Sequence, residues 1–257
     1  MIDLTKARKA FKEYVKNYDP EDKQIKLKIT HIERTAIRAR EIAEKLGLEK
    51  EDIELAELIG ILHDIGRFEQ VRRFHTFSDR DSINHGECGV QVLFEQNLIR
   101  DFVEDNQYDE IIKKAILNHN RAGIEEGLSE KELLHARLIK DADKTDIFYT
   151  LTFDDIKAVY GTYDFSNDKI SDEIYRNFIE EKRIDYSKRK GPADVLVSHF
   201  QFLYHFYFSY GLQYVYDHGY IDEFYNRFTF KDEETAKRYE NVYKASKEYV
   251  KNKLSNS

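Results

Sequence analysis

The chain has 257 residues, which is enough for one large domain or for one domain with a helical extension. Only 2 Pro and 11 Gly interrupt long stretches of Glu, Lys, Leu, Ile and Ala, so the composition predicts an all-α protein. The formal net charge of −8 argues against binding of duplex nucleic acid, and the single cysteine, Cys88, excludes an intramolecular disulfide. The charged N-terminus lacks an apolar signal core, so we expect a cytoplasmic protein.

The first predicted helix begins at residues 30–33, Thr-His-Ile-Glu. Thr30 can cap the helix, and Glu33 lies three residues later, as in a capping box. Apolar residues then recur at helical spacing up to Gly47, which is expected to end the helix. This assignment places His31 in the first helical turn.

The second predicted helix runs from about Asp52 and leads into the sequence Ile-Leu-His-Asp-Ile-Gly-Arg. Apolar residues cover nearly its whole circumference, which is typical of a buried helix. His63 and Asp64 lie near its end, and Gly66 is expected to end it. Residues 67–87 are rich in charges and are predicted to form a loop.

Two further histidines are predicted to lie on helices. His85 stands at the entrance of a short helix that includes residues 90–94. In residues 108–120, His119 shares one face with three apolar residues at i, i+3, i+4 and i+7 spacing. This pattern places His119 on the core side of its helix.

A second capping box, Ser-Glu-Lys-Glu at residues 129–132, begins another predicted helix. This helix carries Asp141, Asp143 and Asp146 among apolar residues, where an acidic side chain needs a partner. His135 lies on a charged stretch of the same helix and is expected to be solvated.

Aromatic-rich helices are predicted from about residue 151 onward. Residues 196–216 contain no Asp, Glu, Lys or Arg, but they include two histidines and five tyrosines, so we predict one buried helix and no membrane span. Residues 232–254 predict a final amphipathic helix. We therefore divide the chain into residues 1–150 and an aromatic-rich C-terminal helical extension, residues 151–257, which is expected to pack on the first part as one globule.

Histidines and carboxylates come from five separate predicted helices or helix ends, each beside apolar residues: His31, His63 with Asp64, His85, His119, and Asp141 or Asp143. Such groups are costly to bury unless they are paired, and one divalent cation satisfies several of them at once. Nitrogen and carboxylate ligands suit Mn²⁺, Fe²⁺, Co²⁺, Ni²⁺ or Zn²⁺. His63 and Asp64 point about 100° apart on a regular helix, so they either converge where the helix ends or reach two centres. The sequence thus predicts a metal site, and periodicity alone does not choose between the two aspartates.

The order His31, then His63-Asp64, then an aspartate within Lys-Asp-Ala-Asp-Lys resembles the HD-domain metal-dependent phosphohydrolase superfamily over about residues 25–150. The resemblance implies an HD-domain helical bundle with His31, His63, Asp64 and Asp143 as ligands of a first metal. Asp143 is preferred to Asp141 because the last aspartate of the family usually lies in an Ala-Asp-Lys/Arg context. His85 and His119 correspond to the extra histidines of family members with two metals. The implied cofactor is one or two divalent ions, Mn, Fe, Co, Ni, Zn or Mg.

The resemblance also implies a mechanism of hydrolysis. Asp64 would be shared by two metals whose bound water attacks phosphorus, so that no serine or cysteine nucleophile is needed. Arg67 and Lys144 are the best-placed cations for a substrate phosphate. Asp64, Arg67 and Lys144 are therefore the predicted catalytic residues.

The expected activity is that of a metal-dependent phosphohydrolase, a phosphomonoesterase or phosphodiesterase acting on a nucleotide or similar small phosphate ester. No duplex nucleic acid or membrane partner is expected, and the sequence leaves the oligomeric state open. The residues after His119 read Asn-Arg-Ala-Gly, not Gly-Tyr-Pro, which argues against the cyclic-dinucleotide enzymes of the family. Two alternatives stay open: a di-iron oxygenase of the same fold, and a non-catalytic sensor that binds metal or nucleotide.

Overall fold

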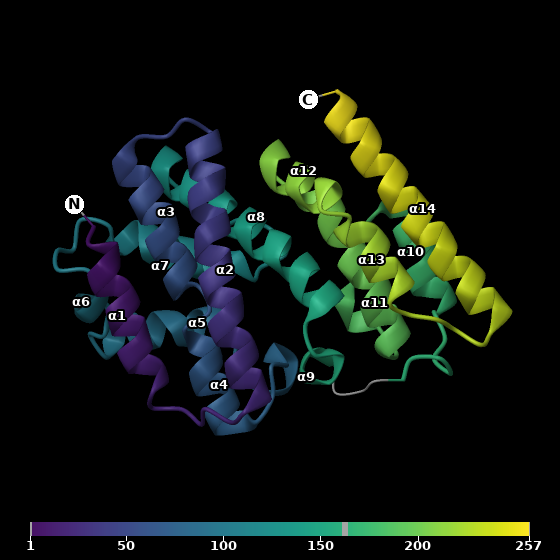
Figure 1. Ribbon diagram of the computed structural model, residues 1–257, viewed down its shortest axis with the longest axis horizontal. Helices are drawn as coiled ribbons and strands as arrows, with labels where there is room; N and C mark the ends of the chain where they lie inside the picture. Colours follow the sequence, from purple (N-terminus) through teal and green to yellow (C-terminus); the bar gives the residue numbers. More distant parts are fainter. Residues whose placement is uncertain (1, 161–163, 257) are drawn as a thin grey trace. The chain divides into compact units, whose positions relative to one another are not determined.

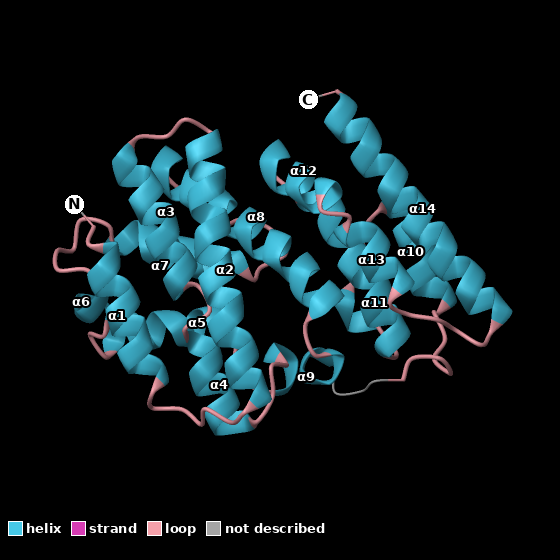
Figure 2. Ribbon diagram, in the orientation of Figure 1, coloured by secondary structure: helices cyan, strands magenta, loops and turns pink. Residues whose placement is uncertain are grey.

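The computed structural model describes residues 2–160 and 164–256, and within these ranges the chain forms helices, turns and loops without a strand (Figure 2). The predicted all-α fold is confirmed. The chain divides into two compact units, Met1–Asp146 and Ile147–Ser257, each with its own apolar core. The division falls inside one helix, and the predicted packing of residues 151–257 on residues 1–150 stays a prediction.

The first unit is a bundle of long and short helices (Figure 1). Its elements are α1 (Leu4–Val15), α2 (Lys23–Lys45), α3 (Lys50–Leu62), α4 (Gly66–Phe74), α5 (His85–Val90), α6 (Ile99–Phe102), α7 (Asp109–His119) and the start of α8 (Glu130–Phe153), with short helical turns at Asp79–Asp81 and Gln91–Glu95. Helices α2 and α3 lie side by side and pack extensively against each other. Gly60 permits this approach, because a Cβ there would lie 2.5 Å from the Cα of Ala36 on α2.

Helix α2 begins well before the predicted start at Thr30. Asp22 caps it, and its carboxylate accepts hydrogen bonds from the backbone N–H groups of Gln24 and Ile25. Thr30 lies about two turns into the helix, where its hydroxyl donates back to the carbonyl of Leu27 at 3.0 Å. The predicted helix start at Thr30 is therefore wrong, and His31 lies in the middle of a 23-residue helix.

Gly66 begins α4 and does not end α3, which finishes at Leu62. The predicted loop at residues 67–87 is accordingly wrong over the part that α4 occupies, where Phe68 and Val71 are buried. A Cβ on Gly66 would overlap the backbone carbonyl of His85, so glycine is needed for α4 to lie against α5. The turn between α3 and α4 holds His63 and Asp64.

The remaining predicted helices of this unit are present. His85 is the first residue of α5, and His119 is the last residue of α7 with its side chain buried. The capping box at the start of α8 is confirmed by the hydrogen bond from the Ser129 N–H to the Glu132 carboxylate, 2.7 Å. The prediction for His135 is wrong: its side chain is fully buried, with Nε2 2.9 Å from Asp52, because α8 turns this position toward α3.

The second unit contains the end of α8 and the helices that follow it. These are α9 (Ile156–Tyr160), α10 (Asp172–Glu181), α11 (Pro192–Phe200), α12 (Ser209–Asp217), α13 (Tyr220–Asn226) and α14 (Glu233–Ser255), with short 3₁₀ turns at Tyr186–Lys188 and Gln201–His205. The predicted amphipathic helix at residues 232–254 is confirmed as α14, which Asp232 caps. A mixed aromatic and aliphatic core joins these helices.

The uncharged segment at residues 196–216 is not the single helix that was predicted. Helix α11 ends at Phe200, a 3₁₀ turn follows, and the backbone is extended at Phe206 and Phe208 before α12 begins. Aromatic and polar side chains alternate too irregularly here to give one continuous apolar face. Among the described residues, no helix has the length and apolarity that crossing a membrane requires.

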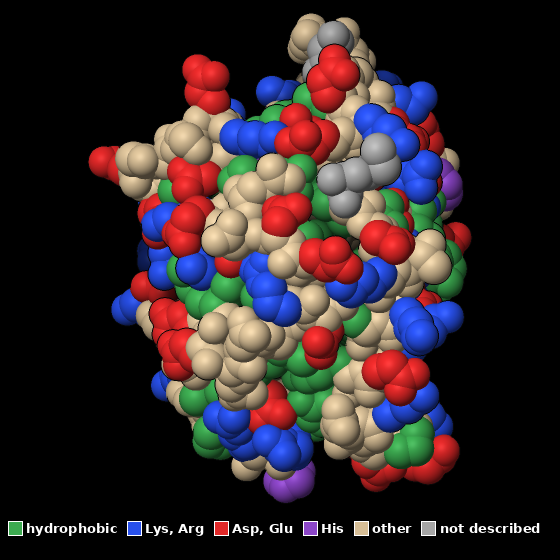
Figure 3. Space-filling view, turned by 90° about the vertical axis from the view of Figure 1, so that its left-hand side faces the viewer, with side chains coloured by type: hydrophobic (Ala, Val, Ile, Leu, Met, Phe, Trp, Pro, Cys, Tyr) green, Lys and Arg blue, Asp and Glu red, His purple; other side chains and the backbone are tan. Residues whose placement is uncertain are grey.

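Charged side chains of both signs share the face of the molecule shown in Figure 3. Lys and Arg side chains alternate there with Asp and Glu, over a surface that also exposes scattered apolar side chains. On this face the negative net charge is therefore dispersed, as is typical of a solvated surface.

Candidate metal centre

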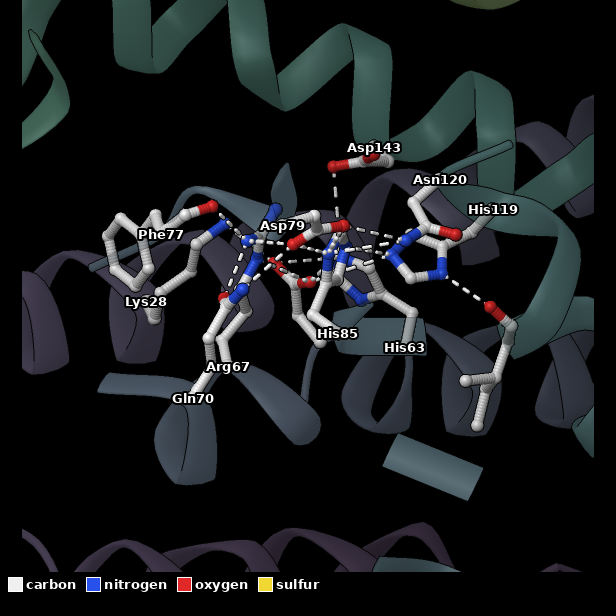
Figure 4. Close-up of polar contacts among 12 residues, drawn as sticks. Lys28, His63, Arg67, Gln70, Phe77, Asp79, His85, His119, Asn120 and Asp143 are labelled. Atoms are coloured by element: carbon white, nitrogen blue, oxygen red, sulfur yellow. Dashed lines mark hydrogen bonds and ion pairs between the residues drawn. The ribbon is translucent and has the colours of Figure 1, made fainter. Parts of the chain in front are cut away.

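Six of the predicted site residues meet in the interior of the first unit. They come from the middle of α2 (His31), the turn after α3 (His63, Asp64), the start of α5 (His85), the end of α7 (His119) and α8 (Asp143). His63 and Asp64 lie in the turn that follows α3, and their side chains converge, with His63 Nε2 3.7 Å from Asp64 Oδ2. Figure 4 shows Asp143 reaching toward the cluster from α8, with His63, His85 and His119 directed at one another below it.

One half of the cluster surrounds the Oδ2 atom of Asp64. His31 Nε2 lies 3.5 Å and His63 Nε2 lies 3.7 Å from this oxygen. Asp143 Oδ1 completes the group at 3.1 Å from His31 Nε2 and 3.7 Å from His63 Nε2. Two histidines and two carboxylates thus face one small space.

The other half surrounds the Oδ1 atom of the same carboxylate. His85 Nε2 lies 3.4 Å and His119 Nε2 lies 3.5 Å from Asp64 Oδ1. The two imidazole nitrogens are 2.9 Å apart. Asp64 therefore presents one oxygen to each pair of histidines.

All four histidines are oriented by an acceptor at Nδ1. These acceptors are Asp146 Oδ2 for His31 (2.7 Å), the Gly60 carbonyl for His63 (2.8 Å), Asp79 Oδ2 for His85 (2.7 Å) and the Ile116 carbonyl for His119 (2.6 Å). A proton on Nδ1 serves each acceptor and leaves a lone pair on Nε2. The cluster is thus lined with lone pairs, as it is in proteins where an outer acceptor holds a metal-binding imidazole.

The inner atoms lack partners that a metal would supply. His31 Nε2, His63 Nε2 and Asp64 Oδ1 are buried without a hydrogen bond among the described residues. The facing lone pairs of His85 and His119 repel each other unless a proton or cation lies between them. Ligand atoms around one ion with bonds of about 2.1 Å lie about 3.0–3.4 Å apart, close to the separations seen here. The donor set fits a divalent ion in each half.

A scan against family models gives a match over residues 29–147, and the model that matches is described as HD domain. This segment of the chain is an HD domain. No curated protein and no solved structure matches the sequence. The HD family is made up mostly of metal-dependent phosphohydrolases and binds divalent metals, so the buried histidines and carboxylates lie where such a domain would hold its metal.

Electrostatics around the cluster favour an ionised Asp64 and neutral imidazoles at His63 and His85, whereas the pKa of His31 is raised, because the effect of burial is outweighed by its contacts with Asp143 and Asp146. Burial alone would raise the pKa of Asp64, but Lys28 and His63 hold this pKa well below its usual range. Burial lowers the pKa of His63, and burial together with nearby Arg67 lowers the pKa of His85 to about 3. Metal ligation requires these same protonation states.

Arg67 and Lys144, the two cations predicted to contact a substrate phosphate, lie in different surroundings. Arg67 lies beside the cluster, with Nε 3.6 Å from Asp64 Oδ1, and this nitrogen is buried without a hydrogen bond. Lys144 donates to Asp141 at 3.0 Å, one turn back along α8. Since Asp141 pairs with Lys144 while Asp143 faces His31, the geometry favours Asp143 over Asp141 as the candidate ligand.

The sequence analysis missed several residues that shape the centre. Lys28 lies 2.6 Å from Asp64 Oδ2, and Asp79 holds His85 while accepting from Arg67 and Gln70. Lys28 stood before the predicted helix start, although its position three residues from His31 would place both on one face of a longer helix. Asp79 lay in a segment predicted as loop, where spacing carries no information about contacts.

Proposed function

We propose that this protein is a metal-dependent phosphohydrolase, a phosphomonoesterase or phosphodiesterase, acting on a nucleotide or similar small phosphate ester. The observation that carries the proposal is the position of Asp64 between two pairs of histidines, in one of which both inner nitrogens, His31 Nε2 and His63 Nε2, are buried without a hydrogen bond. Two metals held a few ångströms apart are the arrangement that many phosphate-hydrolysing enzymes use. The family match supports the same class of reaction.

The side chains have separable tasks in this proposal. The divalent ions, when bound, would lower the pKa of water and neutralise phosphoryl oxygens. The histidines and Asp143 would hold these ions, and Asp64 would contribute one carboxylate oxygen to each half of the centre. Arg67 Nε, buried beside Asp64 and without a hydrogen bond, is a donor for a substrate oxygen. Lys144 stays a proposed contributor through the charge that it adds beside Asp143.

The nucleotide part of the proposal rests on the family, because enzymes with this signature include many that hydrolyse nucleotides. The cations at the centre suit an anionic substrate such as a phosphate ester, because Lys28 and Arg67 lie within 3.6 Å of Asp64. A di-iron oxygenase that acts on an anionic substrate stays the alternative, which the iron content distinguishes. A sensor without activity is disfavoured because the cluster supplies a full ligand set in two halves.

The proposal is tested by measuring the metal content of protein purified without added metal, followed by screening of phosphomonoesters and phosphodiesters with Mn²⁺. We expect phosphate-ester hydrolysis that His63→Ala abolishes and that the exposed control His218→Ala preserves. Bound iron with oxygen consumption, and no hydrolysis of any ester, would show the oxygenase reading to be correct. Retained hydrolysis in folded His63→Ala would remove the metal centre from the mechanism.

A further inference from the structure

The cationic side chains near the centre differ in how many of their N–H donors already have an acceptor in the protein. Arg67 Nη1 donates to the Phe77 carbonyl at 2.6 Å and to Asp79 at 3.0 Å. This end of the guanidinium therefore holds the loop after α4. Lys144 is paired with Asp141. Among the described residues, Lys28 contacts the Asp64 carboxylate and the Phe77 ring.

Lys28 approaches Asp64 more closely than any other charged side chain described above. Its Nζ lies 2.6 Å from Asp64 Oδ2 and 5.4 Å from the centre of the Phe77 ring. An ammonium has three N–H donors, and among the described residues only Asp64 accepts one of them. The side chain is 16% exposed, so the free donors are reachable from solvent while the aromatic ring holds the ammonium in place. Figure 4 shows Lys28, Phe77 and Arg67 together on one side of the histidines.

The charge of the centre indicates what these donors bind. Two divalent ions, when bound, would outweigh the carboxylates of Asp64 and Asp143 by two positive charges, and Lys28 would raise the excess to three. The other nearby carboxylates are each matched by a cation: Asp146 by Arg34, Asp79 by Arg67, and Asp141 by Lys144. A phosphate monoester carries close to two negative charges near neutral pH, whereas a diester carries one.

We propose, resting on the phosphohydrolase function above, that Lys28 binds a non-bridging oxygen of the substrate phosphate and that the substrate is a phosphate monoester with a dianionic terminal phosphate. A diester keeps two non-bridging oxygens but carries only one negative charge, so it would leave more of the positive charge around Lys28 uncompensated. Lys28 thus selects the terminal phosphate.

The reaction that follows is balanced with water as the second reactant. The water oxygen forms a bond to phosphorus, the ester P–O bond breaks, and the leaving alcohol takes up a proton that the water releases. The products are the alcohol and inorganic phosphate. Inorganic phosphate keeps the charged oxygens that Lys28 contacts, so it is a suitable probe of Lys28 apart from turnover.

The first test measures the binding of inorganic phosphate to Mn²⁺-loaded protein by calorimetry. Lys28→Gln is compared with Lys26→Gln, which removes the same charge from an exposed position on the same helix. We expect Lys28→Gln to raise the Kd for phosphate about tenfold to a hundredfold, Lys28→Arg to preserve it largely, and Lys26→Gln to leave it unchanged. Metal content and helicity are measured on the same samples, so that a change in folding or loading is recognised.

The second test compares hydrolysis of p-nitrophenyl phosphate with that of bis(p-nitrophenyl) phosphate by the unmodified protein. We expect a higher kcat/KM for the monoester, and a rise in KM for it in Lys28→Gln. Preferred hydrolysis of the diester, or an unchanged phosphate Kd in folded and loaded Lys28→Gln, would overturn the role of Lys28 while leaving the phosphohydrolase function intact. Absence of hydrolysis of both esters would contradict that function, and the phosphate titration would still report on Lys28.

Discussion

The two halves of the candidate metal centre are built from different kinds of elements. His31 and Asp143 are carried by the long helices α2 and α8, and His63 directly follows α3, which packs extensively against α2. His85 and His119 come from the six-residue α5 and from the last residue of α7. Packing of long helices therefore adds to the polar contacts that position the first half, whereas the second half depends more heavily on polar contacts around short elements.

Those polar contacts form a clamp around His85 and His119. Gln70, fully buried on α4, donates to Asp79 at 2.8 Å and to the carbonyl of Ile83 at 2.9 Å, and Asp79 in turn holds His85. Lys140 donates to the carbonyl oxygens of Asn118 and His119 at the end of α7. This difference suggests that the second half can be weakened without disturbing the first.

The largest expected effect comes from Asp64→Asn, because Asp64 is the one ligand that both halves share. Asparagine presents a single neutral carbonyl oxygen and an amide N–H₂ group, so one half loses its oxygen and both lose the negative charge. We expect metal affinity to fall at least about a hundredfold at both positions, with loss of hydrolysis. Metal titration checks this, and Asp101→Asn on the exposed face of α6 is the matched control. Loss of only one bound ion would show that Asp64 serves a single metal.

His119→Ala is expected to remove one bound ion per chain and to leave the other in place. His119 Nε2 lies on the Oδ1 side of Asp64, together with His85, and the His119 ring also packs edge-to-face against the ring of His63. His31→Ala is expected to remove the ion on the opposite side. If either substitution released both ions with equal affinity loss, the two halves would have to be treated as one site.

Changes to the polar clamp are expected to be milder and confined to the second half. Asp79→Asn removes the charge that orients His85, and Gln70→Leu removes the donor that holds Asp79. We expect metal affinity at the second position to fall about 10–100-fold while the first position is unchanged. Gln91→Ala, at an exposed position after α5, serves as the control. Equal weakening of both positions would contradict a clamp that acts on the second half alone.

The smallest effects are expected from the two glycines at the helix contacts. Gly60→Ala pushes α2 away from α3 and should lower the free energy of unfolding by about 1–3 kcal/mol. Gly66→Ala acts in the same way on α4 and α5, so it should also weaken the second metal position. Gly123→Ala, where a Cβ meets nothing within 4 Å, is the control. Chemical denaturation measures all three, and an unaltered Gly60→Ala protein would show that the contact between α2 and α3 is loose.

The candidate ligand residues and most helices could be proposed from the sequence because both leave periodic or ordered patterns. Buried faces of α3 and α7 repeat at helical spacing, and the order of histidines and aspartates resembles a family signature. The start of α2 was not accessible, because a threonine followed three residues later by a glutamate looks the same inside a helix as at its beginning. Helix α4 was hidden by its charges, although Phe68 and Val71 mark a buried face.

Contacts that join distant residues could not be predicted from spacing. Lys28 and Asp64 are 36 positions apart, and His135 and Asp52 are 83 positions apart, so their pairing depends on how α2, α3 and α8 pack. His135 illustrates the error that follows: charged neighbours in sequence suggested solvent, whereas the helix turns this ring inward to a carboxylate. The same limit explains why Arg67 and Lys144 were predicted as phosphate contacts while Lys28 was overlooked.

Electron paramagnetic resonance of Mn²⁺-loaded protein, combined with the count of bound ions, tests the sharing of Asp64 most directly. Two ions joined by one carboxylate are magnetically coupled, so we expect two equivalents of Mn²⁺ with a coupled spectrum. In His119→Ala we expect one equivalent with the spectrum of an isolated ion. A single equivalent in the unmodified protein, or two equivalents without coupling, would contradict a centre in which Asp64 is shared by two metals.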